Sequence, residues 1–194
     1  PPSADTTNWL ASHSSTEIRL KSDLQIKEKS YLTIAGQTAP GKGITLADRA
    51  LKIRKSNHII VRYLRIRVGD ENKTVPTNPD CVTVEYDDHI ILDHLSLSWG
   101  IDGNGDFRGL KHATVQWSIF SEALHDSGLH RENAHAMCSS FRESAGFATL
   151  HHNIYATSRN RHPSTAGGSE VMEFANNINY NWSGCHNLSG EQYN

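Results

Sequence analysis

Short runs of β-branched and aromatic residues recur along the chain and are separated by segments rich in Gly, Asn, Asp and Ser. These runs cover residues 31–35, 59–68, 89–99, 113–120, 147–155 and 171–182. Runs of this length and composition predict β-strands, and no long segment shows the 3.6-residue period of an amphipathic helix. The pattern therefore predicts an all-β protein.

Five of the runs contain a similar six-residue core. The cores begin at Val61, Leu92, Val115, Leu150 and Phe174, so their starts are 31, 23, 35 and 24 residues apart. Intervals in this range favour a solenoid whose coils bury their inner faces by stacking on one another. Unequal intervals indicate loops of variable length, where a binding groove would be built. An open sandwich of irregular strands is the alternative.

Length and composition narrow the class further. A chain of 194 residues without a Pro- or Ser-rich linker predicts a single domain over residues 1–194. Nineteen basic and 21 acidic residues nearly balance, so bulk charge indicates neither nucleic acid nor an anionic membrane as a partner. No apolar run approaches the length of a membrane helix. The first ten residues lack the features of a signal peptide, so we expect a removed leader or a fragment of a longer chain.

Cysteine content argues against a disulfide framework. Cys81, Cys138 and Cys185 are too few for a disulfide scaffold, and their odd number leaves at least one unpaired within the chain. We expect each of them to be a small buried apolar residue.

The segment Asp102-Gly103-Asn104-Gly105-Asp106 is the strongest candidate for cation chemistry. In a flat strand its two carboxylates would be about 13 Å apart, too far to share one ion. The glycines and the asparagine predict a bend that brings the carboxylates together, and such oxygen ligands suit calcium. The segment is not an EF-hand loop, because Phe107 and Ala113 stand where that loop needs glycine and glutamate.

Several longer motifs resemble a known family. In order along the chain they are Leu32-Thr33-Ile34-Ala35-Gly36-Gln37-Thr38-Ala39-Pro40-Gly41, residues 60–67, Leu92-Asp93-His94-Leu95-Ser96-Leu97-Ser98-Trp99-Gly100, residues 115–122, His151-His152-Asn153 and residues 176–182. In this order they are similar to pectate lyase family 1, over most of the chain from about residue 18 to residue 182. The resemblance implies a right-handed parallel β-helix, secretion, and calcium-dependent β-elimination of polygalacturonate, an acidic plant polysaccharide. The chain is short for that family, so the β-helix is expected to be short or partial.

The resemblance also implies roles for particular residues. Asp80, Asp102 and Asp106 correspond to the family's calcium-binding carboxylates. Arg161, in Arg161-His162-Pro163, corresponds to the arginine that acts as the base. Arg159 is the nearby competitor for this role if the loop is shifted, and otherwise a candidate for substrate binding. A free arginine is normally protonated up to a pKa above about 12, so this chemistry implies local deprotonation or alkaline pH.

The chain departs from the family pattern at two places. The family often has further arginines after the proline, whereas this chain has Ser164, Thr165 and Ala166. The family's substrate-binding lysine has no counterpart between Gly128 and His135, where Arg131 is the candidate substitute. These losses would weaken substrate binding or activity.

The histidines are not expected to perform the chemistry. His94 and His152 are interpreted as structural hydrogen-bonding residues. His125, His130 and His135 are spaced by five, which fits no single helix or strand face, so we interpret them as loop or surface residues and not as a zinc site.

Two functional hypotheses follow. The first is a calcium-dependent pectate lyase; the second is a noncatalytic β-helix that binds acidic polysaccharide with calcium. A structural solenoid without either property is a third, weaker possibility. Hydrolysis is less attractive, because carboxylates bound to a metal cannot also act freely as acid and base.

Overall fold

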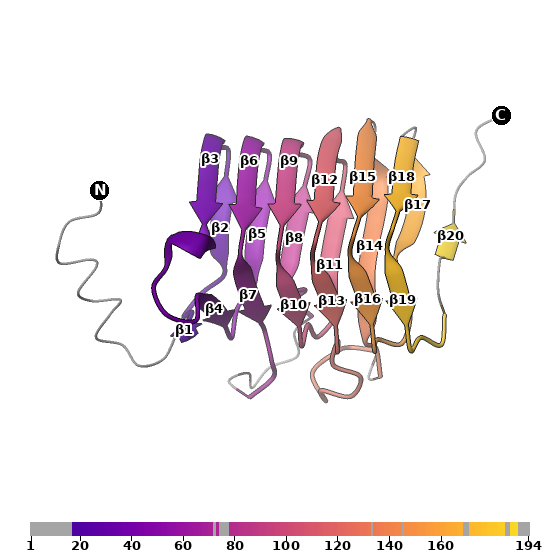
Figure 1. The fold of residues 1–194 in the computed structure, drawn as a ribbon. Coiled ribbons are helices and arrows are strands. Elements are labelled where there is room, and N and C mark those ends of the chain that lie inside the picture. Colours follow the sequence, from indigo (N-terminus) through magenta and orange to yellow (C-terminus); the bar gives the residue numbers. More distant parts are fainter. Residues whose placement is uncertain are drawn as a thin grey trace.

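The chain winds through three parallel β-sheets in turn, and every third strand joins the same sheet (Figure 1). The computed structural model describes residues 17–71, 73, 78–132, 134–144, 146–168, 171–184 and 187–189. Every strand pair in these residues is parallel. The fold is a parallel β-solenoid of about six turns, which confirms the all-β solenoid prediction.

The strands are grouped by sheet as follows. The first sheet contains β1 (Glu17–Arg19), β4 (Ile44–Ala47), β7 (Leu64–Arg67), β10 (Ser96–Ser98), β13 (Ile119–Ser121), β16 (Ile154–Ala156) and β19 (Ile178–Tyr180). The second contains β2 (Leu24–Lys27), β5 (Leu51–Arg54), β8 (Val82–Glu85), β11 (Gly103–Arg108), β14 (Met137–Ser144), β17 (Ser164–Gly168) and β20 (Asn187–Ser189). The third contains β3 (Ser30–Ala35), β6 (Asn57–Arg62), β9 (Asp88–Asp93), β12 (His112–Gln116), β15 (Phe147–His151) and β18 (Val171–Ala175). One short 3-10 turn, η1 (Gly36–Thr38), follows β3.

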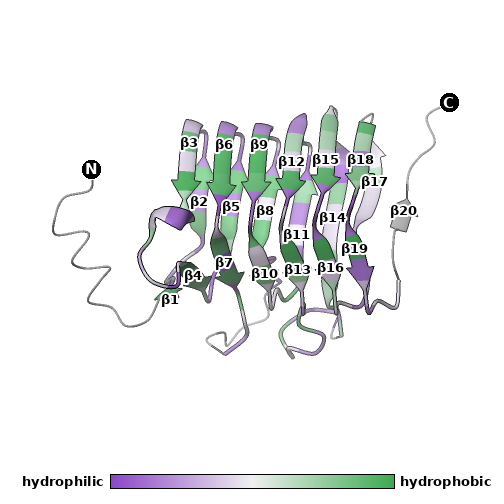
Figure 2. Ribbon diagram, viewed as in Figure 1, coloured by the Kyte–Doolittle hydropathy of each residue, from purple (hydrophilic) through white to green (hydrophobic). Residues whose placement is uncertain are grey.

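The five repeated cores stack in the register that their spacing predicts. Val61 pairs with Leu92, Leu92 with Val115, Val115 with Leu150, and Leu150 with Phe174. The first four side chains are buried, and Phe174 packs against the same core. Figure 2 shows the corresponding hydrophobic bands running across the third sheet. Each coil therefore buries its inner side chains against the coils next to it, as a solenoid requires.

Each predicted run from residue 59 onward holds two strands and not one. The break lies at a residue with positive φ, which turns the chain from the third sheet into the first: Tyr63, His94, Trp117, His152 and Asn176 have φ between 49° and 57°. Four of these five corners carry a bulky ring instead of the Gly or Asn that usually marks such a turn. Each of these runs therefore contributes one strand to the third sheet and one to the first.

Asparagine side chains hold the backbone just after this corner. Asn153 Oδ1 accepts a hydrogen bond from Ser118 N at 3.0 Å, and Asn153 Nδ2 donates to Val115 O at 2.8 Å. In the next coil, Asn177 Oδ1 accepts from Asn153 N at 2.8 Å, and Asn177 Nδ2 donates to Leu150 O at 2.7 Å. These amides satisfy backbone groups that leave the sheet at the turn.

Aromatic rings and thiols complete the interior. Phe107 stacks on Phe141 with centroids 4.3 Å apart, and Phe120 stacks on Tyr155 at 5.1 Å. Cys81 and Cys138 are buried free thiols, as expected, and burial raises the pKa of the Cys81 thiol to about 12. Cys185 lies outside the described residues.

Candidate active site

Four residues singled out in the sequence line one small cavity at the start of the strands of the second sheet. Asp80 precedes β8, Asp102 precedes β11, Asp106 lies within β11, and Arg161 precedes β17. The cavity has a volume of about 20 Å³, enough for one water molecule or one ion. Its complete lining is Asp80, Asp102, Gly103, Gly105, Asp106, Met137, Ser139, Ser140, Arg142 and Arg161.

The bend predicted between Asp102 and Asp106 is wrong, and so is the argument that only a bend lets both residues serve one site, because both line the cavity from strand β11 and the residue directly before it. Gly103 to Arg108 form strand β11, paired with β8 on one side and β14 on the other. Gly103 serves a different purpose, because a Cβ there would lie 3.0 Å from Asp80 Oδ1 and 3.1 Å from Met137 O. The absence of a side chain lets Asp80 from the neighbouring coil approach the strand closely.

Asp80 is the most perturbed carboxyl group of the cavity. Burial raises the pKa of Asp80 well above its usual range, and the charges of Asp102 and Asp106 raise it further. Arg142 and Arg161 act in the opposite direction. The Ser139 hydroxyl oxygen, also on this cavity, is buried without a hydrogen-bond partner. Asp80 therefore shares the cavity with two acidic side chains that raise its pKa and with an unsatisfied oxygen, an environment that a hard cation with oxygen ligands would stabilise.

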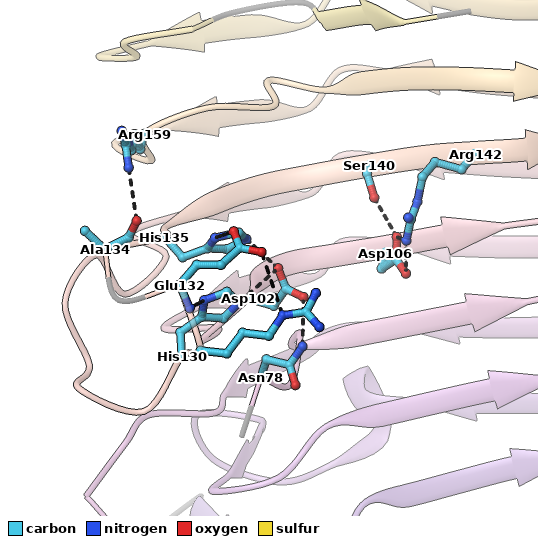
Figure 3. Close-up of polar contacts among 11 residues, drawn as sticks. Asn78, Asp102, Asp106, His130, Glu132, Ala134, His135, Ser140, Arg142 and Arg159 are labelled. Carbon is cyan, nitrogen blue, oxygen red and sulfur yellow. Dashed lines mark hydrogen bonds and ion pairs between the residues drawn. The ribbon is translucent and has the colours of Figure 1, made fainter. Parts of the chain in front are cut away.

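Asp106 is held by the next coil. Arg142 Nη2 lies 2.7 Å from Asp106 Oδ1 and 2.8 Å from Oδ2, and Ser140 Oγ donates to Oδ1 at 2.5 Å (Figure 3). Sequence reasoning missed Arg142. Only an indirect signal pointed to it. The cores at Val115 and Leu150 are 35 residues apart, so the residue stacked on Asp106 in the next coil should lie near position 141. The observed partner of Asp106 is Ser140, two residues before Arg142.

Asp102 meets two histidines from the loop that precedes β14. His135 Nε2 lies 2.7 Å from Asp102 Oδ1, and His130 Nε2 lies 3.9 Å from the same oxygen (Figure 3). The two rings stack with centroids 3.8 Å apart, and both residues are buried. Burial lowers the pKa of His135, and the nearby charge of Asp102 partly offsets this by raising it. All three histidines lie in loops, as expected; His125 is exposed, whereas His130 and His135 are buried against Asp102.

The three predicted arginines have different surroundings. Arg161 lines the cavity, and its carbonyl oxygen accepts a hydrogen bond from Ser139 N at 2.9 Å. Arg159 Nη1 instead donates to Ala134 O at 3.0 Å (Figure 3), and the Arg131 side chain is 76% exposed beside Glu132. Neither Arg131 nor Arg159 lines the cavity. The structure thus brings Arg161 and Arg142 together with the acidic residues.

His94 and His152 belong to a ring stack at the corner between the third and first sheets. His94 lies between Tyr63 and Trp117, with centroids 4.4 Å and 6.2 Å away, and His152 stacks on Trp117 at 4.2 Å. His94 Nδ1 contacts Asp93 Oδ1 at 2.6 Å. These contacts fit the structural interpretation of both histidines.

The described residues thus define a parallel β-solenoid with an acidic, arginine-containing cavity on one sheet. No model of a known protein family matches the chain. The chain is, however, similar in sequence to curated proteins named "Probable pectate lyase C". The protein from Emericella nidulans is 34% identical over 154 residues, which are 79% of this chain and 33% of the relative. The protein from Aspergillus flavus is 34% identical over 161 residues (82% and 35%), and that from Aspergillus fumigatus is 35% identical over 154 residues (79% and 33%).

These similarities confirm the resemblance to pectate lyases that the sequence motifs indicate. The chain spans about a third of the length of these curated relatives. In the described part of the chain, no helix is both long enough and apolar enough to span a membrane.

Proposed function

We propose that this chain carries the catalytic centre of a calcium-dependent pectate lyase that cleaves polygalacturonate by β-elimination. The single observation that carries the proposal is the convergence of Asp80, Asp102, Asp106 and Arg161 on one cavity. These residues come from positions up to 81 apart in the sequence (161 − 80 = 81), and the names of the relatives point to the same activity.

Asp80, Asp102 and Asp106 would hold calcium in this scheme. The ion would supply charge neutralisation for the substrate carboxylate and electrostatic stabilisation of the enolate-like transition state. A cation here is supported by the raised pKa of Asp80, which is caused first by burial and then by the nearby charges of Asp102 and Asp106.

The arginines would act on the substrate. Deprotonated Arg161 accepts the proton from C5 of a galacturonate unit, the electron pair forms the C4–C5 double bond, and the glycosidic oxygen leaves C4 with its electron pair. Arg142 lines the same cavity and presents a guanidinium group that can bind the C6 carboxylate. Arg142 would thereby compensate for the family arginines that Ser164, Thr165 and Ala166 replace.

The substrate would be de-esterified pectate outside the cell. A free C6 carboxylate can bridge to a cation and to an arginine, whereas a methyl ester removes that charge. We accordingly propose secretion, with an acidic plant polysaccharide as the partner.

A noncatalytic calcium-dependent binding module is the second candidate. It is favoured by the positions of Arg131 and Arg159, which do not line the cavity and leave it with fewer cationic groups than the resemblance implies. This module would bind polygalacturonate with calcium and release no unsaturated product.

One experiment separates the two candidates. Polygalacturonate is incubated with the protein at mildly alkaline pH with calcium or with a chelator, and the absorbance of the unsaturated uronate is followed while binding is measured by affinity electrophoresis. A calcium-dependent rise in absorbance supports the lyase. Calcium-dependent binding without any rise overturns it in favour of the binding module.

A further inference from the structure

Three histidines form a ladder on the third sheet, apart from the acidic cavity. His58, His89 and His112 occupy equivalent positions in three successive coils, since Ile59 pairs with Ile90 and Ala113 pairs with Ile90. The rings of His58 and His89 stack with centroids 4.6 Å apart, and those of His89 and His112 at 4.7 Å. The ring contacts therefore hold neighbouring imidazoles side by side.

Asp88 lies between two of these rings. His89 Nδ1 lies 2.9 Å from Asp88 Oδ1, and His112 Nδ1 lies 2.7 Å from the same oxygen. One ligand atom from each of Asp88, His89 and His112 lies within 4.8 Å of the other two. His112 Nδ1 is hydrogen-bonded to Asp88 Oδ1, and because a carboxylate oxygen only accepts hydrogen bonds, a neutral His112 ring carries its proton on Nδ1 and its lone pair on Nε2. His89 Nδ1 is close enough to the same oxygen to adopt the same tautomer.

We propose that Asp88, His89 and His112 form a binding site for a first-row divalent metal ion of the zinc type, distinct from the calcium site. The ion would take the place of the two Nδ1 protons between the rings and the carboxylate. Each ring would keep one proton by moving it to Nε2, so both imidazoles stay neutral and Asp88 stays a carboxylate. Two imidazole nitrogens and one carboxylate oxygen are a ligand set that zinc favours, with water in the fourth position.

Metal binding requires two movements: the contacts to Asp88 must widen, and the stacked rings of His89 and His112, now inclined by 30° with centroids 4.7 Å apart, must turn so that both Nδ1 atoms point at the ion. A tetrahedral zinc ion with ligands at about 2.0–2.2 Å sets neighbouring ligand atoms roughly 3.3 Å apart. The present separations of 2.9 Å and 2.7 Å to Asp88 Oδ1 must therefore widen by about half an ångström. The side chains of His89 and His112 are about half exposed and line an open groove over the third sheet, so they can move and an ion can reach them.

The other acidic and histidine cluster is a weaker metal site. At Asp102, His130 and His135, the Nδ1 atom of His130 accepts a hydrogen bond from Glu132 N at 3.0 Å. The neutral ring must then carry its proton on Nε2, the atom that faces Asp102, so binding a metal there would break the Glu132 bond. In the Asp88 cluster the Nδ1 atoms of His89 and His112 both face Asp88 Oδ1, so moving each proton to Nε2 gives up only the contact that the ion would replace.

A bound ion would link β9 to β12 and so join two adjacent coils. Because it would bind the folded chain only, it would stabilise the solenoid in proportion to its concentration. Calcium would compete poorly for this site, since it prefers oxygen ligands.

Isothermal titration calorimetry with zinc, on chelator-treated full chain in excess calcium, tests the inference. We expect one zinc ion per chain, and at least about tenfold weaker binding in His89→Ala and His112→Ala. His152→Ala, which removes an imidazole from the other ring stack, serves as the matched control and should bind like the wild type. Cobalt titration, followed by its visible absorption, gives an independent readout of the ligand geometry.

Asp88→Asn keeps an oxygen acceptor for both rings and so tests the carboxylate without removing their hydrogen bonds. Circular dichroism in chelator establishes the fold of each variant. The inference is overturned if the wild type binds no zinc, if calcium displaces the zinc, or if His135→Ala abolishes binding while His89→Ala and His112→Ala do not. None of these readouts depends on lyase activity, so failure here leaves the proposed function untouched.

Discussion

Arg142 on β14 contacts both carboxylate oxygens of Asp106 on β11, at 2.7 Å and 2.8 Å, across 36 residues of sequence. The pairing arises because β14 stacks directly on β11, with Asp106 opposite Ser140. Arg142 therefore reaches the acidic cavity from the neighbouring coil, where it can neutralise Asp106 in the absence of calcium and contact a substrate carboxylate in its presence.

Arg142→Ala is expected to raise the KM for polygalacturonate by roughly tenfold or more. This fold-change corresponds to the binding free energy lost with one or two charge-assisted hydrogen bonds. Calcium affinity should increase at the same time, because Arg142 no longer competes for Asp106. Steady-state kinetics and calcium calorimetry measure the two effects. Arg108→Ala is the matched control, since Arg108 pairs with Glu143 on the same sheet at 2.9 Å and 2.6 Å and does not line the cavity. An unchanged KM in Arg142→Ala would show that Arg142 has no role in substrate binding.

Gly103→Ala is expected to reduce calcium affinity, because its Cβ would crowd Asp80 Oδ1 at 3.0 Å. Gly105→Ala provides the contrast: its Cβ would meet the Phe107 and Phe120 rings at 2.8 Å and 3.0 Å, so it should cost about 1–3 kcal/mol of folding free energy with little effect on calcium. Calorimetry and chemical denaturation of both variants separate the effects. Equal calcium affinity in Gly103→Ala and wild type would contradict this account of Asp80.

The repeated cores predicted the stacking of the third sheet in full register, because inward aliphatic residues such as Leu92 and Leu150 must meet in every coil. The corners were not predictable from turn chemistry, since rings such as His94 and Trp117 occupy the positive-φ positions. Asp102 and Asp106 could be singled out from the sequence itself, whereas Asp80 and Arg161 are assigned to the site only through the family resemblance. Arg142 reaches the cavity through strand stacking, and His135 reaches Asp102 through a folded loop; neither leaves a local signal in the sequence.

Asn153→Ala is expected to destabilise the fold by about 2–4 kcal/mol, because Ser118 N and Val115 O would lose their partners at a buried position. Urea denaturation with a constant m-value measures the change. Asn57→Ala is the control. The Asn57 Oδ1 atom contacts the exposed His58 ring, so this substitution should lower the free energy of unfolding by less than about 0.5 kcal/mol. Similar losses in the two variants would argue against the proposed role of the Asn153 side chain.

Asp87 gives a pH dependence whose sign can be worked out. Burial raises the pKa of Asp87 to about 6, and the hydrogen bond from Ser56 N only partly opposes this. In the folded protein Asp87 has a pKa of about 6, whereas in the unfolded chain its pKa is near 4, so the folded state binds this proton more tightly. The protonated group therefore contributes its full stabilisation below about pH 4, and this contribution is lost as the pH rises through about 6.

Asp87→Asn should therefore gain stability relative to wild type between pH 4 and pH 8, by about 2–3 kcal/mol. The amide retains an oxygen acceptor for Ser56 N. Denaturation of both proteins at several pH values in chelator gives the difference directly, and a difference that does not change with pH would refute the assignment.

The central claim is tested most directly by the initial rate of unsaturated product formation from polygalacturonate, with saturating calcium at alkaline pH, in wild type, Arg161→Ala and Arg159→Ala. Loss of a general base typically costs about 10²–10⁴-fold in rate, so we predict a loss in this range for Arg161→Ala. Arg159→Ala, which removes the neighbouring arginine outside the cavity, should stay within severalfold of wild type. A folded Arg161→Ala protein with near wild-type rate, or a wild-type rate that calcium does not affect, would contradict the account.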